Sequence, residues 1–223
     1  GDATDIVIGG CSAGGIATFA HLDYVASSLT ALAPRARVVG FPDSGFYSNV
    51  PYFSDKKMFP FQAQNASATL SQRCLAEHAA APHLCLVAEV NTAYIKTPLF
   101  AWQSKFDYDQ LSSSVSPPCN DSSCAIPYSE HLVAAMLRGL FGRGGGSSKP
   151  AAATRPAHGA FIDGCYRHCD YVASGGGGSS VANITAQGLT PLQAIAKWYG
   201  QSGPDKALLI EQAAPAFPCP TCC

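Results

Sequence analysis

Charged residues are scarce in this sequence. Aspartate, glutamate, lysine and arginine make up 13% of the 223 residues, and the formal net charge is −1. So little charge leaves no basic field of the kind that holds nucleic acid, which excludes that class of partner. Long apolar runs are also missing, and no stretch reaches the roughly 20 residues of a membrane-spanning helix. The chain, 47% hydrophobic, is instead long enough to close one globular core.

Cysteine, by contrast, is abundant, with ten residues. Most of them lie close together in the sequence, at Cys74 and Cys85, Cys119 and Cys124, Cys165 and Cys169, and Cys219, Cys222 and Cys223. This usage favours disulfides in an oxidising compartment. The alternative is zinc, because Cys219 and Cys222 have the spacing of half a zinc site; no second pair of matching spacing accompanies them, so we expect no metal.

Three sequons for N-glycosylation support the same compartment. They place acceptor asparagines at Asn65, Asn120 and Asn183, and such glycans mark surface loops of secreted proteins. We therefore expect a secreted protein that works outside the cell or at the cell surface.

The stretch from Thr4 to Ala17 has the pattern of a nucleophile elbow. A β-branched run at residues 6–8 stops at glycines, and Ser12 lies at the centre of Gly-Cys-Ser-Ala-Gly. This order predicts a strand, a sharp turn and a helix, with Ser12 in a strained turn. Gly10 and Gly14 are then expected to be small so that the strand and helix can pass closely. The Ala13 N–H, at the helix N-terminus, would face a developing oxyanion.

The rest of the chain predicts alternating helices and strands. The expected elements are a helix up to Pro34, a strand over 36–41, a helix over 66–80, a strand over 99–103, a helix capped by Ser129 and ended by Gly142, a last strand over 158–163 and a helix from Thr190. Such alternation indicates an α/β fold, a parallel sheet flanked by helices, in one domain over residues 1–223. Two Gly/Ser-rich segments, 142–157 and 174–181, are expected to be flexible insertions.

A serine nucleophile needs a histidine base and a carboxylate that orients it. Serine is too weakly acidic to attack an ester unaided, and α/β-hydrolases place the serine, the acid and the histidine in that order along the chain. Ser12, Asp107 and His168 satisfy this order, each just after a predicted strand. Asp109 is a rival acid. His158 is a rival base, but it precedes its strand and would lie at the wrong edge of the sheet.

A turn at residues 42–46 ends another predicted strand. Open α/β folds bind ligands at that edge of the sheet. Asp43 could be a catalytic acid or a turn former. Because Asp107 is the better acid, we expect Asp43 and Phe46 to shape the substrate pocket.

Several short blocks, in the same order along nearly the whole chain, resemble one family. The sequence is similar to the pectin acetylesterase/Notum family of secreted serine carboxylesterases, and more so to its plant branch. The blocks are residues 8–15 with 21–23, 43–46, Cys74 to Cys85, 95–100 with 106–107, Cys119 to Cys124, 165–169, 194–199 and 219–222.

That resemblance implies an α/β-hydrolase fold and a function. Ser12 would be the nucleophile, Asp107 the orienting acid and His168 the general base. They would hydrolyse O-acetyl or O-acyl esters of an extracellular or cell-wall polysaccharide without a metal or organic cofactor. It also implies local disulfides in the segments Cys74–Cys85 and Cys119–Cys124. The alternative is a non-catalytic extracellular module that keeps the fold for structure or glycan binding.

The sequence departs from that family before the elbow. Family members carry a long preceding segment with the first sheet strands and a glycine-rich loop that supplies other oxyanion donors. We expect this chain to be the C-terminal part of a longer protein and to associate with that N-terminal segment. Without that segment, the elbow strand of this chain would expose an open edge of the sheet. Cys11 would find its partner in that segment or serve as a small buried hydrophobe.

Overall fold

The computed structural model describes residues 2–142, 156–169, 184–200, 207–214, 216–219 and 222–223. The predicted insertions at 142–157 and 174–181 lie outside these residues, apart from positions 142, 156 and 157. Asn183 lies outside them as well.

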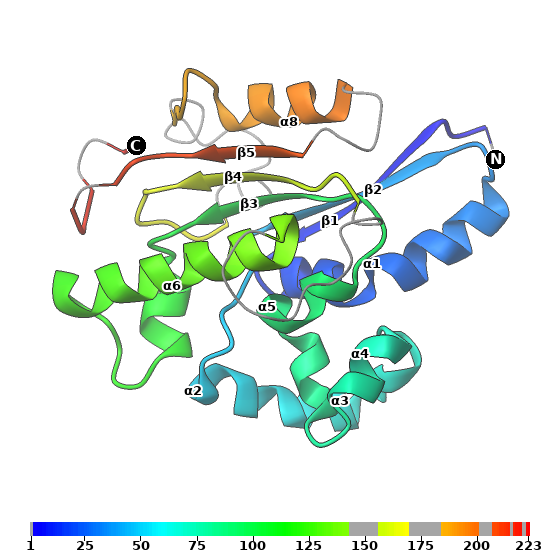
Figure 1. The fold of residues 1–223 in the computed structure, drawn as a ribbon, viewed down its shortest axis with the longest axis horizontal. Coiled ribbons are helices and arrows are strands. Elements are labelled where there is room, and N and C mark those ends of the chain that lie inside the picture. The colour runs from blue at the N-terminus through cyan, green and yellow to red at the C-terminus, as the bar shows by residue number, and fades with distance from the viewer. Residues whose placement is uncertain (1, 143–155, 170–183, 201–206, 215, 220–221) are drawn as a thin grey trace.

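A parallel sheet of five strands forms the centre of the described structure (Figure 1). Its strands are paired in the order of the sequence, β1-β2-β3-β4-β5. They are β1 (Asp5–Cys11), β2 (Arg37–Asp43), β3 (Phe100–Ser104), β4 (Gly159–Asp163) and β5 (Leu208–Glu211). The predicted α/β class is therefore confirmed. The expectation that the strand over 158–163 is the last is wrong, because β5 follows it and pairs with β4.

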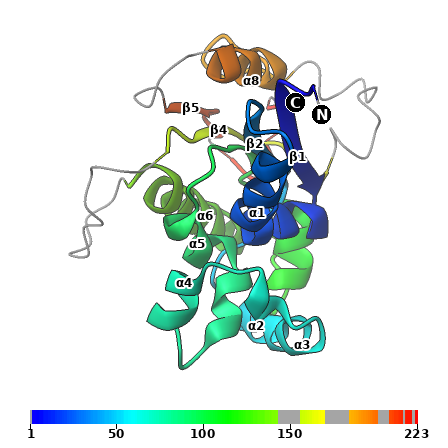
Figure 2. The same ribbon diagram turned by 90° about the vertical axis from the view of Figure 1, so that its right-hand side faces the viewer.

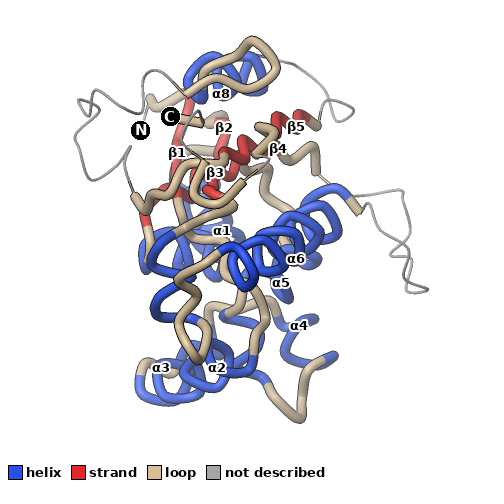
Figure 3. Tube along the Cα trace, turned by 90° about the vertical axis from the view of Figure 1, so that its left-hand side faces the viewer, coloured by secondary structure: helices blue, strands red, loops and turns tan. Residues whose placement is uncertain are grey.

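Helices cover both faces of the sheet (Figures 1 and 2). Helix α8 lies over one face, and α1, α5 and α6 lie over the other, with α2, α3 and α4 beyond them. Figure 3 shows the same layers from the side opposite to that of Figure 2. The helices are α1 (Ala13–Leu32), α2 (Pro51–Ser54), α3 (Met58–Ala63), α4 (Gln72–Glu77), α5 (Ala88–Asn91), α6 (Ser122–Phe141) and α8 (Pro191–Gly200).

Two apolar clusters fill the space on the two sides of the sheet. One joins Phe19 of α1 to Leu132 of α6, and the other joins Trp198 of α8 to Phe161 of β4. Every residue of β3 and β4 is buried. Strands covered on both faces read as apolar runs without alternation, which is why these two segments were recognisable from the sequence.

Two helices differ from the pattern-based expectation. The helix expected over 66–80 is a 3₁₀ turn at Ala66–Ala68 followed by α4, whose first turn is capped by the Ser71 hydroxyl. Helix α6 starts well before Ser129, where the Asp121 carboxylate accepts a hydrogen bond of 2.8 Å from the Ser123 N–H. Proline in its second turn removes one backbone donor without ending the helix. Gly142 does end α6, in the left-handed conformation with φ of 65°.

All ten cysteines are paired, in five disulfides. The expected Cys74–Cys85 and Cys119–Cys124 bonds are present. Cys219 and Cys222 bond to each other rather than presenting thiolates for zinc. The remaining disulfides are Cys165–Cys223 and Cys11–Cys169. Both expectations for Cys11 are therefore wrong, because its partner lies within this chain.

Strand β1 stands at the edge of the sheet. Among the described residues it pairs only with β2, in parallel register from Asp5–Arg37 to Cys11–Asp43. Val7 on this strand is 59% exposed. The expected open edge is thus present in the described part of the chain. Within that part, no helix combines the length and apolarity needed to cross a membrane.

Candidate active site

Ser12 lies in the sharp turn between β1 and α1. Its backbone has φ of 55° and ψ of −119°, a conformation that costs a non-glycine residue free energy. Two hydrogen bonds hold the turn: the Ser12 N–H donates to the Asp43 carbonyl at 3.1 Å, and the Ser12 carbonyl accepts from the Ile16 N–H at 2.8 Å. Ala13 begins α1, so its N–H has no partner within the helix and lies at the positive end of the helix dipole. This local geometry is that of a nucleophile elbow.

Close backbone contacts explain the glycines of the elbow. A Cβ on Gly10 would lie 2.8 Å from the Gly14 carbonyl carbon, and one on Gly15 would lie 2.7 Å from the Gly45 Cα. A Cβ on Gly14 would meet nothing within 4 Å. The expectation that Gly14 itself must be small is therefore wrong, because the crowded positions are Gly10 and Gly15.

His168 and Asp107 form a hydrogen-bonded pair at the carboxyl ends of β3 and β4. The imidazole Nδ1 lies 2.8 Å from Oδ1 of Asp107 and 2.9 Å from Oδ2. Asp107 is fully buried, whereas the His168 side chain is 9% exposed. A carboxylate beside Nδ1 favours the tautomer that donates from this nitrogen, which leaves Nε2 free to accept a proton.

The surroundings of Asp107 fix the direction of its carboxylate. The Gln103 amide donates to Oδ2 at 3.0 Å, and the Asp109 and Gln110 N–H groups donate to Oδ1 at 3.0 and 3.3 Å. The rival acid, Asp109, accepts instead from the Tyr47 hydroxyl at 2.6 Å. The structure thus joins His168 to Asp107, while Asp109 has a different partner.

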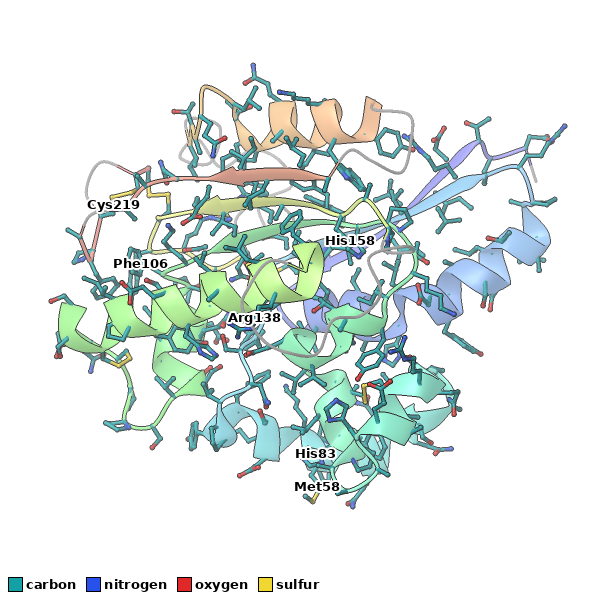
Figure 4. The ribbon with its side chains drawn as sticks, in the orientation of Figure 1. Met58, His83, Phe106, Arg138, His158 and Cys219 are labelled. Atoms are coloured by element: carbon teal, nitrogen blue, oxygen red, sulfur yellow. A yellow bond between two sulfur atoms is a disulfide. The ribbon has the colours of Figure 1, made fainter. Side chains whose placement is uncertain are left out.

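The rival base, His158, lies at the amino ends of the strands, opposite to Asp107 and His168. His158 precedes β4, is buried, and accepts a hydrogen bond from the Leu99 N–H at 3.3 Å. Figure 4 shows His158 at the amino ends of the strands and Phe106, the neighbour of Asp107, at the carboxyl ends. This is the separation expected from the sequence.

Arg167, next to His168, anchors the histidine loop to the sheet. It is almost fully buried and donates to Oδ2 of Asp163 from two nitrogens, at 2.6 and 3.1 Å. Its third nitrogen lies 3.7 Å from Oδ1 of Asp43, and its guanidinium stacks 4.4 Å from the Trp102 ring centre. Buried charges persist when they are paired in this way. Asp43 is therefore part of a buried ion-pair cluster behind the histidine.

Phe46 is placed in the hydrophobic core. Its ring is fully buried and packs edge to face on Phe19, with 5.7 Å between ring centres. Its N–H donates to the Gln103 side chain at 3.0 Å. Because Gln103 also holds Asp107, Phe46 supports the site from within the core.

A disulfide connects the serine turn to the histidine loop. Cys11 immediately precedes Ser12, Cys169 immediately follows His168, and these cysteines are bonded with a Cα–Cα distance of 5.5 Å. Since neighbouring Cα atoms are about 3.8 Å apart, the Cα atoms of Ser12 and His168 are at most about 13 Å apart. The covalent link therefore keeps the proposed nucleophile and base together.

Tyr47 interacts with Ser12. Its ring is buried and stacked on Phe53, with 4.5 Å between ring centres. Burial and the hydrogen bond to Asp109 raise the pKa of the Tyr47 hydroxyl, and a hydrogen bond with Ser12 opposes that rise. Among the described residues, Ser12 and His168 do not share a hydrogen bond in this structure. Catalytic contacts of this kind often form only once substrate is bound.

The surroundings of His168 raise the pKa of its imidazole. Burial lowers this pKa, but the hydrogen bond and charge of Asp107, with added charge from Asp109 and Asp43, outweigh burial and raise it above the ordinary value of histidine. A base tuned upward in this way binds the Ser12 proton more strongly. The described residues contain no cluster of three or more side chains suited to a metal ion.

A cavity of about 1010 Å³ lies elsewhere in the molecule. It is bordered by α1, α4 and the segment 91–97, and its lining includes Tyr24, Arg73 and Tyr94. Neither Ser12 nor His168 borders it. It is therefore separate from the candidate site.

A parallel sheet with helices on both faces defines an α/β-hydrolase-like fold. Comparison of the sequence with family models gives a match to the family described as Pectinacetylesterase over residues 1–223. This chain belongs to the pectinacetylesterase family.

Individual relatives support the same family. The chain is 28% identical to pectin acetylesterase 5 of Arabidopsis thaliana over 97% of its own length, and 27% identical to pectin acetylesterase 4 over 89%. It spans about half the length of these curated relatives, 52% and 50%. In solved structures, the fold is similar to that of the Wnt deacylase Notum from Drosophila, with a TM-score of 0.66, 17% identity, and coverage of 97% of this chain and 60% of Notum.

Proposed function

We propose that this chain carries the nucleophile, base and acid of a serine carboxylesterase that removes acetyl groups from a polysaccharide. The observation that supports this most directly is the buried His168–Asp107 pair, tied by the Cys11–Cys169 disulfide to the turn that holds Ser12. The names of the family and of its plant relatives support acetyl esters as the substrate.

The reaction follows from these groups. Nε2 of His168 takes the proton of Ser12 as the serine oxygen attacks the ester carbonyl, and the Ala13 N–H binds the oxyanion. The imidazolium then gives its proton to the departing sugar oxygen, which leaves an acetyl group on Ser12. Water, deprotonated by His168, attacks this acyl-enzyme, and acetate leaves as Ser12 regains its proton.

We also propose that an N-terminal segment of the same precursor completes the site. Edge strand β1 can accept a further strand, and Ala13 alone supplies one oxyanion donor where such sites use two or more. Residues 1–223 would then form the C-terminal part of a single α/β-hydrolase domain.

The disulfides support a proposal of secretion into an oxidising compartment. Asn65 and Asn120 are exposed, as N-glycosylation requires, and we propose that both carry glycans.

Acetate release from a panel of acetylated polysaccharides tests the function. We expect the Ser12→Ala variant of the full-length protein to lose at least about a thousandfold in turnover, because the covalent route is gone. Ser27→Ala, which removes an exposed hydroxyl from α1, is the matched control and should keep full activity. A wild-type protein no more active than Ser12→Ala would reject the esterase and favour the non-catalytic module.

A further inference from the structure

A row of aromatic rings leads from the C-terminal segment to the proposed base. Phe217 contacts Tyr166 with 5.6 Å between ring centres, Tyr166 contacts Tyr108 at 5.9 Å, and Tyr108 contacts the His168 imidazole at 5.7 Å. The row is attached to the core, because Phe217 also packs on the buried ring of Phe106 at 5.1 Å.

The two central rings face solvent. Tyr108 is 45% exposed and Tyr166 is 52% exposed. Neither phenol hydroxyl makes a hydrogen bond to another residue in the part of the chain that the structure describes. Single exposed aromatic residues are common on protein surfaces, but adjoining ones beside a reactive group mark a binding surface.

The positions of these rings are set by the proposed catalytic residues themselves. Tyr108 directly follows Asp107, whose carboxylate is held by buried hydrogen bonds. Tyr166 lies between Cys165, which is bonded to Cys223, and Arg167, which is anchored on Asp163. Both rings are therefore carried by the rigid segments that carry Asp107 and His168.

We propose that Tyr108 and Tyr166 form a subsite for the sugar rings of a polysaccharide, adjacent to the ester that Ser12 attacks. This inference rests on the proposed function. The C–H face of a pyranose ring is apolar and packs on an aromatic face, while its hydroxyls need polar partners. Tyrosine meets both needs, because it combines a flat apolar ring with a hydroxyl. A small ester such as p-nitrophenyl acetate has no sugar chain to occupy this subsite.

Substitution of Tyr166 tests the subsite, because the ring that contacts the His168 imidazole is that of Tyr108. For Tyr166→Ala in the full-length protein, we expect kcat/KM on an acetylated polysaccharide to fall about tenfold more than kcat/KM on p-nitrophenyl acetate, mostly through KM. Tyr166→Phe keeps the ring and should restore most of the loss. Tyr24→Ala, on α1, removes a ring that is 50% exposed and does not contact this row, and serves as the control.

The outcomes separate the inference from the function it rests on. If Tyr166→Ala lowers activity on both substrates equally, or leaves the polysaccharide reaction unchanged, the subsite is rejected while the esterase stands. If the wild-type protein is no more active than Ser12→Ala on either substrate, the proposed esterase function itself is rejected.

Discussion

At the scale of single residues, the proposed reaction depends on the charge of His168. The imidazole must be neutral to take the proton of Ser12, and its pKa is raised above the ordinary value of histidine because the hydrogen bond and charge of Asp107 outweigh the effect of burial. Activity is therefore expected to fall as the pH decreases through this raised pKa.

Replacing Asp107 by Asn should change that pH dependence. The substitution removes the negative charge and the acceptor that favour the imidazolium, so the acidic limb of the pH profile of kcat/KM should move to lower pH. Turnover should also fall, by about 10⁴-fold, because the substitution leaves the histidine in the wrong tautomer. The comparison is Asp109→Asn, which removes a carboxylate that is hydrogen-bonded to Tyr47 rather than to His168. In this variant the acidic limb of the pH profile should move less. If the acidic limb of the pH profile does not move in Asp107→Asn, then Asp107 does not act on His168.

Candidate residues in local motifs can be predicted from the sequence, whereas residues that act through distant contacts cannot. Ser12 has its own motif, and the order of residues selects Asp107 and His168. Tyr47 beside Ser12 and Arg167 behind His168 carry no such signal. Their roles depend on partners in other elements, which only folding brings together.

At the scale of elements, the site depends on how the β1–α1 turn is held against the loop after β4. The Cys11–Cys169 disulfide joins these two segments directly, across 158 positions of sequence. We expect this disulfide to keep Ser12 aligned with His168. Such alignment matters because misplacing a reacting group by about 1 Å can lower the rate a hundredfold.

A double variant, Cys11→Ala with Cys169→Ala, tests this role. We expect kcat to fall between about tenfold and a hundredfold, together with a loss of about 2–4 kcal/mol in the free energy of unfolding. The control is Cys74→Ala with Cys85→Ala, which removes a disulfide that borders the separate cavity and not the Ser12 turn. This control variant should have a lower free energy of unfolding. Its kcat, measured well below its melting temperature, should stay within about twofold of the wild-type value. Equal effects of both variants on kcat would mean that the Cys11–Cys169 bond contributes stability alone.

The elements themselves were predictable where burial leaves a clear pattern. Strands β3 and β4 are buried throughout because both faces of the sheet are covered, and each contains a short run of apolar residues. Strand β5 is a four-residue run that becomes a strand through pairing with β4, a tertiary effect with little local signal. The pattern places the start of α6 too late, because proline at position 127 indicates a break, yet this proline falls early enough in the helix to be tolerated.

At the scale of the whole molecule, the edge of β1 and the coverage of relatives point the same way. The edge strand lacks a second neighbour among the described residues, and the chain spans about half of its curated relatives. We expect native protein, after enzymatic deglycosylation, to have an intact mass above 23.2 kDa or to contain a 23.2 kDa chain that copurifies with a companion fragment. A single active polypeptide of 23.2 kDa would reject the proposed N-terminal partner.

The most direct test of the central claim is covalent labelling of the full-length protein with a fluorophosphonate, located by peptide mass spectrometry. This reagent reacts with a serine activated by a neighbouring base. The account predicts one adduct, on the peptide that contains Ser12, absent from Ser12→Ala, strongly reduced in His168→Gln and retained in Ser27→Ala. An unlabelled wild-type protein, or a label that persists in Ser12→Ala, would contradict it.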